Sequence, residues 1–471
     1  MRRPPALAAA VVVGLLPTLP ASAAPASAAP ASGAPAFAAD RRVAPEPVLV
    51  VAPVVPVGEP VALAGLFPRA GEGRRVVVQQ RRGGDWSVVA RTRTSSRGVF
   101  EVRLEETEER VHRYRAVVRR SPDGPRARTR PALTRVAPRV EEITAGLVDS
   151  EAYGHHDSID VSADGRFVSW DSRGGDPDVF VWDRTRQRLA LISPRTSQRT
   201  WGGSLSADGA VAAISTYNSA IRPDQPGRTD YAFPGLVDLR AGLFAPLLSE
   251  DGRVVEGLDP QLSDDATRLL VTSPRGGFGL TQLVRGKHWW IPERATDERA
   301  ERPVLAAGGR HVAWVLQGEP DPVTSQRRAR LMLWEQGSGR REVEVPGRTA
   351  FAPIGLSADG GLVLLEASRP GSEGSTAAYD LLLVSTDTGL VRDLTGDLPR
   401  GAYGGVLADD GSLVHVGTWE GTFVYDTATG RREPASPAPA FLDELDVASG
   451  DGSVLVHEDG PTITTYMPVL P

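Results

Sequence analysis

Apolar and polar residues alternate in short runs along most of the chain. Runs such as "RRVVVQQR" (74–81) and "HRYRAVVRR" (112–120) show the period of two that is typical of half-buried strands. Gly and Asp separate these runs, and residues 46–138 contain no convincing helical period. The pattern predicts an all-β protein.

The runs between residues 44 and 138 predict one β-sandwich of about seven strands. In this segment Trp86 fits a core or hairpin-packing role better than a ligand platform, because large aromatic side chains are mostly buried. The strands are expected at 47–54, 60–67, 74–81, 86–94, 98–104, 112–120 and 130–137.

A repeated hairpin organises the rest of the chain, residues 139–471. "DVSADGRF" (160–167) returns as "SLSADGAV" (204–211) and "GLSADGGL" (355–362), and four further copies bring the total to seven. The turn positions 165, 209, 266, 309, 360, 411 and 452 are 44, 57, 43, 51, 51 and 41 residues apart. Such periods suit the four-stranded blade of a β-propeller.

Each unit repeats the same order of strands and turns. A strand leads to a tight turn in which Gly provides positive φ, and a second apolar strand follows. A variable loop then leads to a third strand, such as "DVFVWD" (178–183), and a short turn to a fourth, such as "RLALIS" (188–193). The Asp-Gly pairs are therefore expected to be scaffold residues.

The last unit supplies only three strands, which would leave an unpaired edge. The strand candidate "RVEEITAGLV" (139–148) precedes the first unit and can complete the last blade. This arrangement predicts pairing between residues near Ile143 and residues near Ile463. Seven copies predict seven blades, with six as the alternative because units three and four match weakly.

Two family resemblances follow from these motifs. The run "VQQRRGGDWSVVARTRTSSRGVFEV" and the strand "YRAVV" resemble bacterial immunoglobulin-like modules. The repeated "SADG" turn with its "DVFVWD"-type strand resembles the TolB-like and WD40-like (PD40) β-propellers of exported bacterial proteins. The second resemblance implies binding to proteins or envelope components, usually without catalysis.

The N-terminus indicates export. Residues 1–23 combine an arginine pair, a short apolar run and an Ala-Ser-Ala site, as in a secretory signal peptide. Residues 24–43 are Ala/Pro/Ser-rich and predict a flexible linker. The apolar run is too short to span a bilayer. We expect a secreted or cell-envelope-associated protein without a transmembrane segment.

Composition narrows the range of partners. A net charge of −6 and a pI near 5.8 argue against nucleic acid as the ligand. The absence of cysteine excludes a disulfide framework.

The sequence lacks several catalytic and nucleotide-binding motifs. It has no G-x-S-x-G and no H-E-x-x-H motif, and Lys287 is followed by His288, which excludes a P-loop. Carboxylate pairs for glycoside hydrolysis cannot be assigned, because their separation is a three-dimensional quantity.

The loops between strands two and three, and those between units, carry most of the length variation and lie on one rim. Aromatic and imidazole residues precede the innermost strands on that rim, where they would surround the mouth of the channel. Packing between blades is the alternative role. The predicted binding residues are His155, His156, Asp157, Trp201, Tyr403 and Trp419.

The segment His155-His156-Asp157 is the one cluster with ligand chemistry. Neighbouring residues in a strand point to opposite sides, so one histidine at most faces the channel easily, and a metal would need ligands from other blades. We therefore expect no metal site, no cofactor and no assigned catalytic residue.

Two functional hypotheses follow. The first is a non-catalytic binding protein whose propeller rim engages a cell-envelope or extracellular protein or polysaccharide. The alternative is a lyase- or hydrolase-like enzyme that acts on polysaccharide with His155 or His156 at the channel mouth. An enzyme needs titratable groups that converge from several blades, whereas a binding protein needs only exposed apolar and polar surface.

Overall fold

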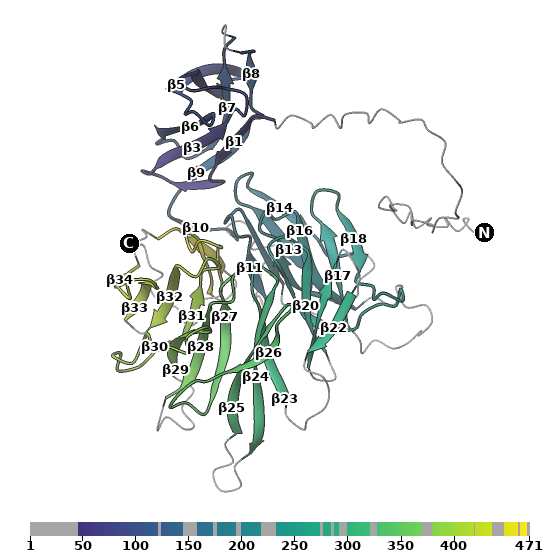
Figure 1. Cartoon of the computed structure of the whole chain (residues 1–471). Coiled ribbons are helices and arrows are strands. Elements are labelled where there is room, and N and C mark those ends of the chain that lie inside the picture. Colours follow the sequence, from purple (N-terminus) through teal and green to yellow (C-terminus); the bar gives the residue numbers. More distant parts are fainter. Residues whose placement is uncertain are drawn as a thin grey trace, which may run out of the picture. The chain divides into compact units, whose positions relative to one another are not determined.

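The computed structural model describes most of the chain from residue 46 onward (Figure 1). The described ranges are 46–120, 124–144, 158–172, 177–194, 199–217, 232–273, 277–283, 287–291, 299–320, 327–369, 379–418, 420–435, 447–459 and 462–468. Within them every regular element is a strand, and no helix is long and apolar enough to cross a membrane.

Two sheets form the first part of the described chain. One sheet has the order β1-β3-β6 and the other β2-β9-β7-β4-β5, with β8 beside β7. The expected strand 47–54 is instead two strands, one in each sheet, because Pro53 between them lacks the N–H that a continuous ladder needs. The strands are β1 (Val48–Val51), β2 (Val54–Pro56), β3 (Pro60–Leu66), β4 (Arg75–Arg82), β5 (Asp85–Arg93), β6 (Val99–Glu105), β7 (Val111–Val118), β8 (Ala127–Arg128) and β9 (Ala132–Ala137).

Seven four-stranded antiparallel sheets follow. The first sheet contains β11 (Ile159–Val161), β12 (Phe167–Asp171), β13 (Val179–Asp183) and β14 (Arg188–Leu191). The second contains β15 (Arg199–Leu205), β16 (Val211–Tyr217), β17 (Phe233–Asp238) and β18 (Leu243–Pro246). The third contains β19 (Leu258–Leu262), β20 (Arg268–Thr272), β21 (Phe278–Gln282) and β22 (Lys287–Ile291). The fourth sheet contains β23 (Arg299–Leu305), β24 (His311–Pro320), β25 (Arg327–Glu335) and β26 (Gly339–Val343). The fifth contains β27 (Phe351–Leu356), β28 (Leu362–Ser368), β29 (Tyr379–Ser385) and β30 (Val391–Asp393). The sixth contains β31 (Gly404–Leu407), β32 (Leu413–Thr418), β33 (Gly421–Asp426) and β34 (Arg432–Pro434).

The seventh sheet joins the two ends of this region. It pairs β10 (Val140–Glu142) with β37 (Thr462–Tyr466), followed by β36 (Leu455–Asp459) and β35 (Val447–Ala448). The Ile143 N–H donates to the Ile463 carbonyl at 2.9 Å, so the pairing predicted near these two residues is confirmed. Both side chains are buried in one cluster with Trp170 of the first sheet.

The first strands of the seven sheets form a closed circuit. β11 contacts β15, and the contacts continue through β19, β23, β27, β31 and β35 back to β11. The described chain is therefore all-β and propeller-like, with a first strand of every sheet on the inside.

The repeated turns hold themselves together. In the first one, the Ser162 hydroxyl donates to an Asp164 carboxylate oxygen at 2.7 Å and accepts from the Phe167 N–H at 2.9 Å. Gly165 has a φ of 66°, which confirms that this turn needs positive φ. The third copy places Ala266 at that position with a φ of 52°, which explains why its sequence matched weakly.

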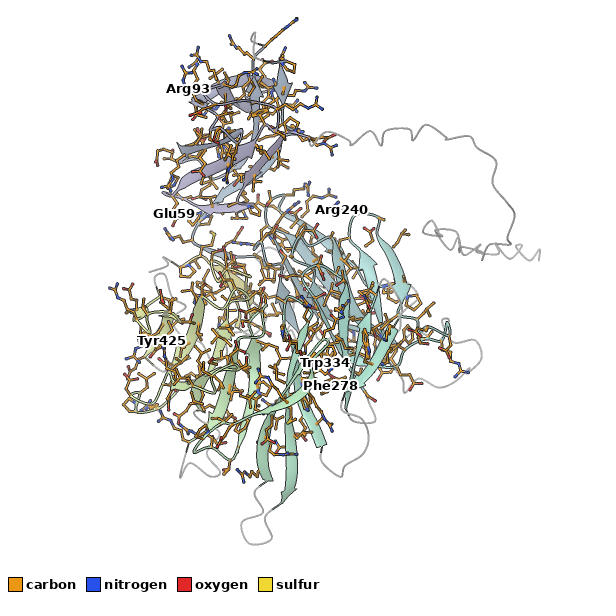
Figure 2. All side chains as sticks on the ribbon, in the orientation of Figure 1. Glu59, Arg93, Arg240, Phe278, Trp334 and Tyr425 are labelled. Atoms are coloured by element: carbon orange, nitrogen blue, oxygen red, sulfur yellow. The ribbon has the colours of Figure 1, made fainter. Side chains whose placement is uncertain are left out.

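Apolar side chains fill the space between neighbouring sheets. Phe278 of β21 meets Trp314 of β24 edge-on, with ring centroids 5.3 Å apart. Trp334 of β25 packs against the same cluster, and Figure 2 labels Phe278 and Trp334 there. These contacts join one sheet to the next.

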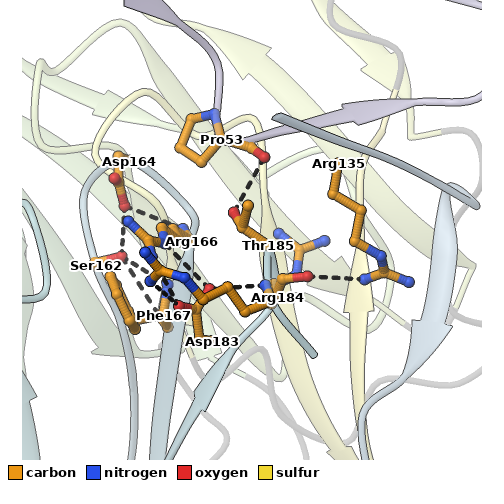
Figure 3. A network of polar contacts seen from close by, with 10 residues as sticks. Pro53, Arg135, Ser162, Asp164, Arg166, Phe167, Asp183, Arg184 and Thr185 are labelled. Atoms are coloured by element: carbon orange, nitrogen blue, oxygen red, sulfur yellow. Dashed lines mark hydrogen bonds and ion pairs between the residues drawn. The ribbon is translucent and has the colours of Figure 1, made fainter. Parts of the chain in front are cut away.

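Polar contacts connect the strands before residue 138 to the turn between β13 and β14 (Figure 3). Arg135 of β9 donates to the Arg184 carbonyl at 3.1 Å and forms an ion pair with Glu141 at 2.6 Å. The Thr185 hydroxyl donates to the Pro53 carbonyl at 3.1 Å. Burial lowers the pKa of the Arg184 guanidinium to about 10, although Glu141 opposes that effect.

Candidate functional site

The second residues of the repeated turns form a backbone ring. The Ala207 N–H donates to the Asp264 carbonyl at 2.9 Å, and the Asp264 N–H donates to the Ala307 carbonyl at 2.9 Å. Backbone hydrogen bonds of this kind join six of the seven pairs of neighbouring turns. One of them runs from the Gly450 N–H to the Ala163 carbonyl at 3.0 Å and links the last turn to the first. The ring positions are Ala163, Ala207, Asp264, Ala307, Ala358, Asp409 and Gly450.

Asp264 and Asp409 are the exceptions in this ring. The other five positions carry Ala or Gly, whose side chains are small enough for neighbouring turns to approach closely. The two aspartates give their turns the sequences "SDDA" and "ADDG" in place of "SADG". The fold therefore introduces a carboxylate at two points of an otherwise apolar ring.

A second tier of polar side chains lies on the first strands of three consecutive sheets. Asp160 of β11 accepts the Leu205 N–H at 2.6 Å, and Ser204 of β15 accepts the Leu262 N–H at 2.9 Å. Gln261 of β19 accepts the Leu305 N–H at 2.8 Å. Each side chain thus satisfies a backbone donor of the next sheet. This side of the channel is polar, whereas Val304 and Val406 occupy the corresponding places in later sheets.

The first strands of the ring line a half-open cavity of about 370 Å³. All seven sheets contribute to its wall, from Ser158 before β11 to Ala448 in β35. Among the described residues its lining contains four aspartates and no Lys, Arg or His. The aspartates are Asp160, Asp259, Asp264 and Asp409.

The carboxyl groups in this cavity have raised pKa values. Burial raises the pKa of Asp160 to about 7, against hydrogen bonds from Leu205 and Val161 that lower it. Burial also raises the pKa of Asp409 to about 7, and the charges of Asp264 and Asp160 add to that shift. Partial burial raises the pKa of Asp264, and the loss of surrounding water raises that of Asp259 as well, although Asp259 remains exposed at the wall of the cavity. The carboxylates repel one another without a compensating cation in the described lining.

Three neighbouring first strands bulge near the opposite end of the cavity. The strand pairing shifts register in β15, β19 and β23, and each bulge contains a residue with positive φ. These residues are Gly202 (76°), Asp259 (47°) and Arg302 (49°). The left-handed conformation costs a non-glycine residue roughly 1–2 kcal/mol. A bulge redirects the side chains of its strand, and it places Asp259 in the wall of the cavity.

Two of the predicted binding residues are described. Trp201 lies in β15, half-buried, and its ring packs on Tyr217 of the next strand with centroids 4.7 Å apart. Tyr403 immediately precedes β31, and its N–H donates to the Gly417 carbonyl at 3.0 Å. Neither side chain lines the acidic cavity. His155, His156, Asp157 and Trp419 lie outside the described residues.

Sequence reasoning missed the four aspartates. Asp264 and Asp409 were visible as departures from the "SADG" repeat, and Asp160 as an acidic residue two positions before the first copy of that repeat. Asp259 had no signal of its own, because a β-bulge cannot be read from a single strand. The described residues contain no group of three or more His, Cys, Asp or Glu side chains arranged to hold a metal ion.

No protein-family model and no curated protein matches the chain. Among solved structures it is similar to an oligogalacturonate lyase in complex with manganese, at 15% identity and a TM-score of 0.48, over 70% of this chain and 93% of that chain. It is also similar to an oligogalacturonate lyase from Vibrio parahaemolyticus, at 13% identity, the same TM-score of 0.48 and the same coverage of 70% and 93%. These likenesses concern the fold only.

Proposed function

We propose that the protein is an exported binding protein in which an immunoglobulin-like sandwich precedes a seven-bladed propeller. Its central cavity takes up a cationic group of a cell-envelope protein or polysaccharide. The observation that carries the proposal is the cavity of about 370 Å³, into which four aspartates converge from three sheets. The resemblance to TolB-like propellers supports the same class of function.

The electrostatics of the cavity favour a cation. Loss of water destabilises the anionic forms of Asp160, Asp264 and Asp409, and neighbouring carboxylates add to the effect at Asp160 and Asp409. A bound ammonium or guanidinium group would supply the missing positive charge and lower the pKa of these carboxyl groups. A cavity of this size accommodates an organic group with several non-hydrogen atoms.

The ligand would enter from the rim that carries the long loops. A propeller of this kind offers one rim of short turns, joined here by the backbone ring, and one rim of variable connections. In the proposal the mouth is formed by Trp201 and Tyr403, with His155, His156, Asp157 and Trp419 as its other predicted members.

Binding of glucosamine oligosaccharides by the full chain tests the proposal, with the N-acetylated oligosaccharides as the uncharged counterpart. We expect binding of the amine form alone. The double variant Asp264→Asn/Asp409→Asn should bind at least about tenfold more weakly, which corresponds to about 1.4 kcal/mol. Asp387→Asn is the matched control, because Asp387 is exposed in the turn before β30 and its loss changes the net charge in the same direction.

A lysine-containing peptide separates the two partner classes. Preference for the peptide over the amino sugar would identify a protein partner, and the reverse preference a polysaccharide. Equal binding of amine and N-acetyl forms, or unchanged binding by the double variant, would contradict the role of the acidic cavity.

The second candidate is an enzyme that acts on polysaccharide, and one observation favours it. Asp160 and Asp409 come from different sheets, line the same cavity and have pKa values of about 7. Carboxyl groups with such values can act as general acid and general base near neutral pH. Release of new reducing ends from an envelope polysaccharide, lost in Asp160→Asn and in Asp409→Asn, would establish this activity in place of simple binding.

A further inference from the structure

A second recess lies between the β11–β14 sheet and the β15–β18 sheet. This groove has a volume of about 840 Å³ and is separate from the acidic cavity, with which it shares no described lining residue. Its walls are β13 and β14 on one side and β17 and β18 on the other, with the turns at Arg166 and Asp208 at its end.

The floor of the groove is the apolar core between the two sheets. Val181, Ile192 and Val237 are buried in that core, while Phe167, Leu239 and Phe244 are only partly covered. Partial cover leaves apolar surface open to an incoming side chain. A groove of this size with an apolar floor has the dimensions of a ligand site.

Its polar rim carries an excess of positive charge. Four arginines and two aspartates line the groove, which leaves two positive charges in a chain of net charge −6. Arg166 contacts Asp183 at 2.7 Å (Figure 3). Arg186 contacts the same carboxylate at 2.8 Å. Arg240, labelled in Figure 2, pairs with Asp208 at 3.2 Å, and Arg188 is exposed without a carboxylate partner among the described residues.

One wall of the groove is a strand edge that pairs with no further strand in the described part of the chain. β14 is the outer strand of its sheet, and the Ile192 N–H after it donates inward to the Val179 carbonyl at 2.9 Å. Backbone groups alternate in direction along an antiparallel strand, so those of Leu189 and Leu191 point away from β13. The exposed Ala190 pairs with Val181, so its side chain faces the groove, whereas Leu191 pairs with Phe180 on the opposite face of the sheet. Such an edge accepts an additional strand.

We infer that this groove binds an extended acidic segment of a partner protein. The segment adds a strand to β14, places alternate apolar side chains on the floor of the groove and directs a carboxylate to Arg188. The backbone edge supplies affinity along the segment, the apolar floor selects its side chains, and the excess of arginine selects an anion. The site therefore prefers the opposite charge to the central cavity.

Selection from a random peptide library displayed on phage, with the immobilised full chain as bait, provides the test. We expect enrichment of peptides in which apolar residues alternate and at least one Asp or Glu is present. A synthetic copy of an enriched peptide should bind about tenfold more weakly to Ala190→Asp and to Arg188→Glu. The matched controls are Ala428→Asp, at an exposed residue in the turn before β34, and Arg340→Glu on the exposed face of β26.

N-methylation of the peptide tests strand pairing directly. Methyl groups on alternate backbone nitrogens should abolish binding in one register and leave it nearly unchanged in the other, because only every second N–H faces β14. Absence of any acidic–apolar enrichment would overturn the inference. Equal loss in the controls, or binding that survives both groove variants, would also overturn it. The Asp264→Asn/Asp409→Asn variant should retain this peptide, so the outcome is independent of the proposed function of the cavity.

Discussion

The protein contains two polar clusters of opposite character, one buried and one in the wall of the half-open central cavity. In the first part of the chain, Gln80 of β4 donates to Glu106 at 2.9 Å and lies 2.7 Å from the His112 ring. Tyr114 of β7 donates to the same Glu106 oxygen at 2.8 Å. Glu106 thus receives donors from two strands, and His112 is 3.6 Å from its other oxygen. Every group in this cluster has a partner.

The carboxylates of the central ring differ in this respect. Asp160 accepts backbone hydrogen bonds, but the described lining supplies no positive charge to Asp160, Asp264 or Asp409. A satisfied buried network fixes one packing arrangement, whereas uncompensated buried charge costs stability and persists where it serves binding or chemistry. The first cluster is therefore structural, and the second is the candidate site.

The largest effect is expected where the satisfied cluster is broken. Tyr114→Phe removes a donor from Glu106 and an acceptor from Gln80, and both groups stay buried. We expect the free energy of unfolding to fall by about 2 kcal/mol. Denaturant unfolding measures it, with Tyr379→Phe as control because Tyr379 is exposed. An equal effect of the two substitutions would contradict the structural role of the first cluster.

A smaller effect on stability, of opposite sign, is expected when Asp409 of the backbone ring is replaced by Asn. The pKa of Asp409 rises from 3.8 to about 7 on folding, so the folded protein holds a proton that the unfolded chain has already released between these values. Its contribution to stability is therefore present below pH 3.8 and is lost as the pH rises through 7. Asp409→Asn removes this loss and should stabilise the protein at pH 8 by about 1 kcal/mol.

Thermal unfolding as a function of pH checks this expectation. The difference in stability between Asp409→Asn and the parent should grow as the pH rises and nearly vanish in acid. A variant less stable than the parent at pH 8 would show that the Asp409 carboxylate is compensated after all.

The smallest effect is expected from adding a charge to the ring. Ala307 occupies the position that corresponds to Asp264 and Asp409 and also lines the cavity. Ala307→Asp should lower stability at pH 8 by about 0.5–1 kcal/mol and strengthen the binding of amine ligands, because it places a further carboxylate near the existing ones. Parallel unfolding and binding titrations measure both. A gain in stability, or weaker binding, would count against an electrostatic origin of the site.

Much of the fold was predictable from local signals. Each "SADG" turn encodes its own hydrogen bonds, so the hairpin at Ser162–Phe167 and its copies appear at the expected places. The closing strand was predictable because the last unit lacked one partner, and Ile143 pairs with Ile463 as expected. The split of the first strand was missed, although Pro53 was a local signal for it.

The acidic cavity was harder to predict from the sequence than the fold. Asp160, Asp264 and Asp409 are separated by long stretches of chain, and only closure of the ring brings them into one cavity. Their pKa values depend on burial and mutual repulsion, which no motif records. Attention to aromatic residues selected Trp201, whose ring packs on Tyr217 instead of lining the acidic cavity.

Proton release on ligand binding tests the central claim most directly. Calorimetric titration with glucosamine oligosaccharide at pH 7, in buffers of different ionisation enthalpy, counts the protons released. Because Asp160 and Asp409 are about half protonated near their pKa of about 7, a bound cation should release close to one proton. That release should disappear in Asp160→Asn/Asp409→Asn. Binding without proton release, or the same release in the double variant, would contradict a cation site formed by these carboxyl groups.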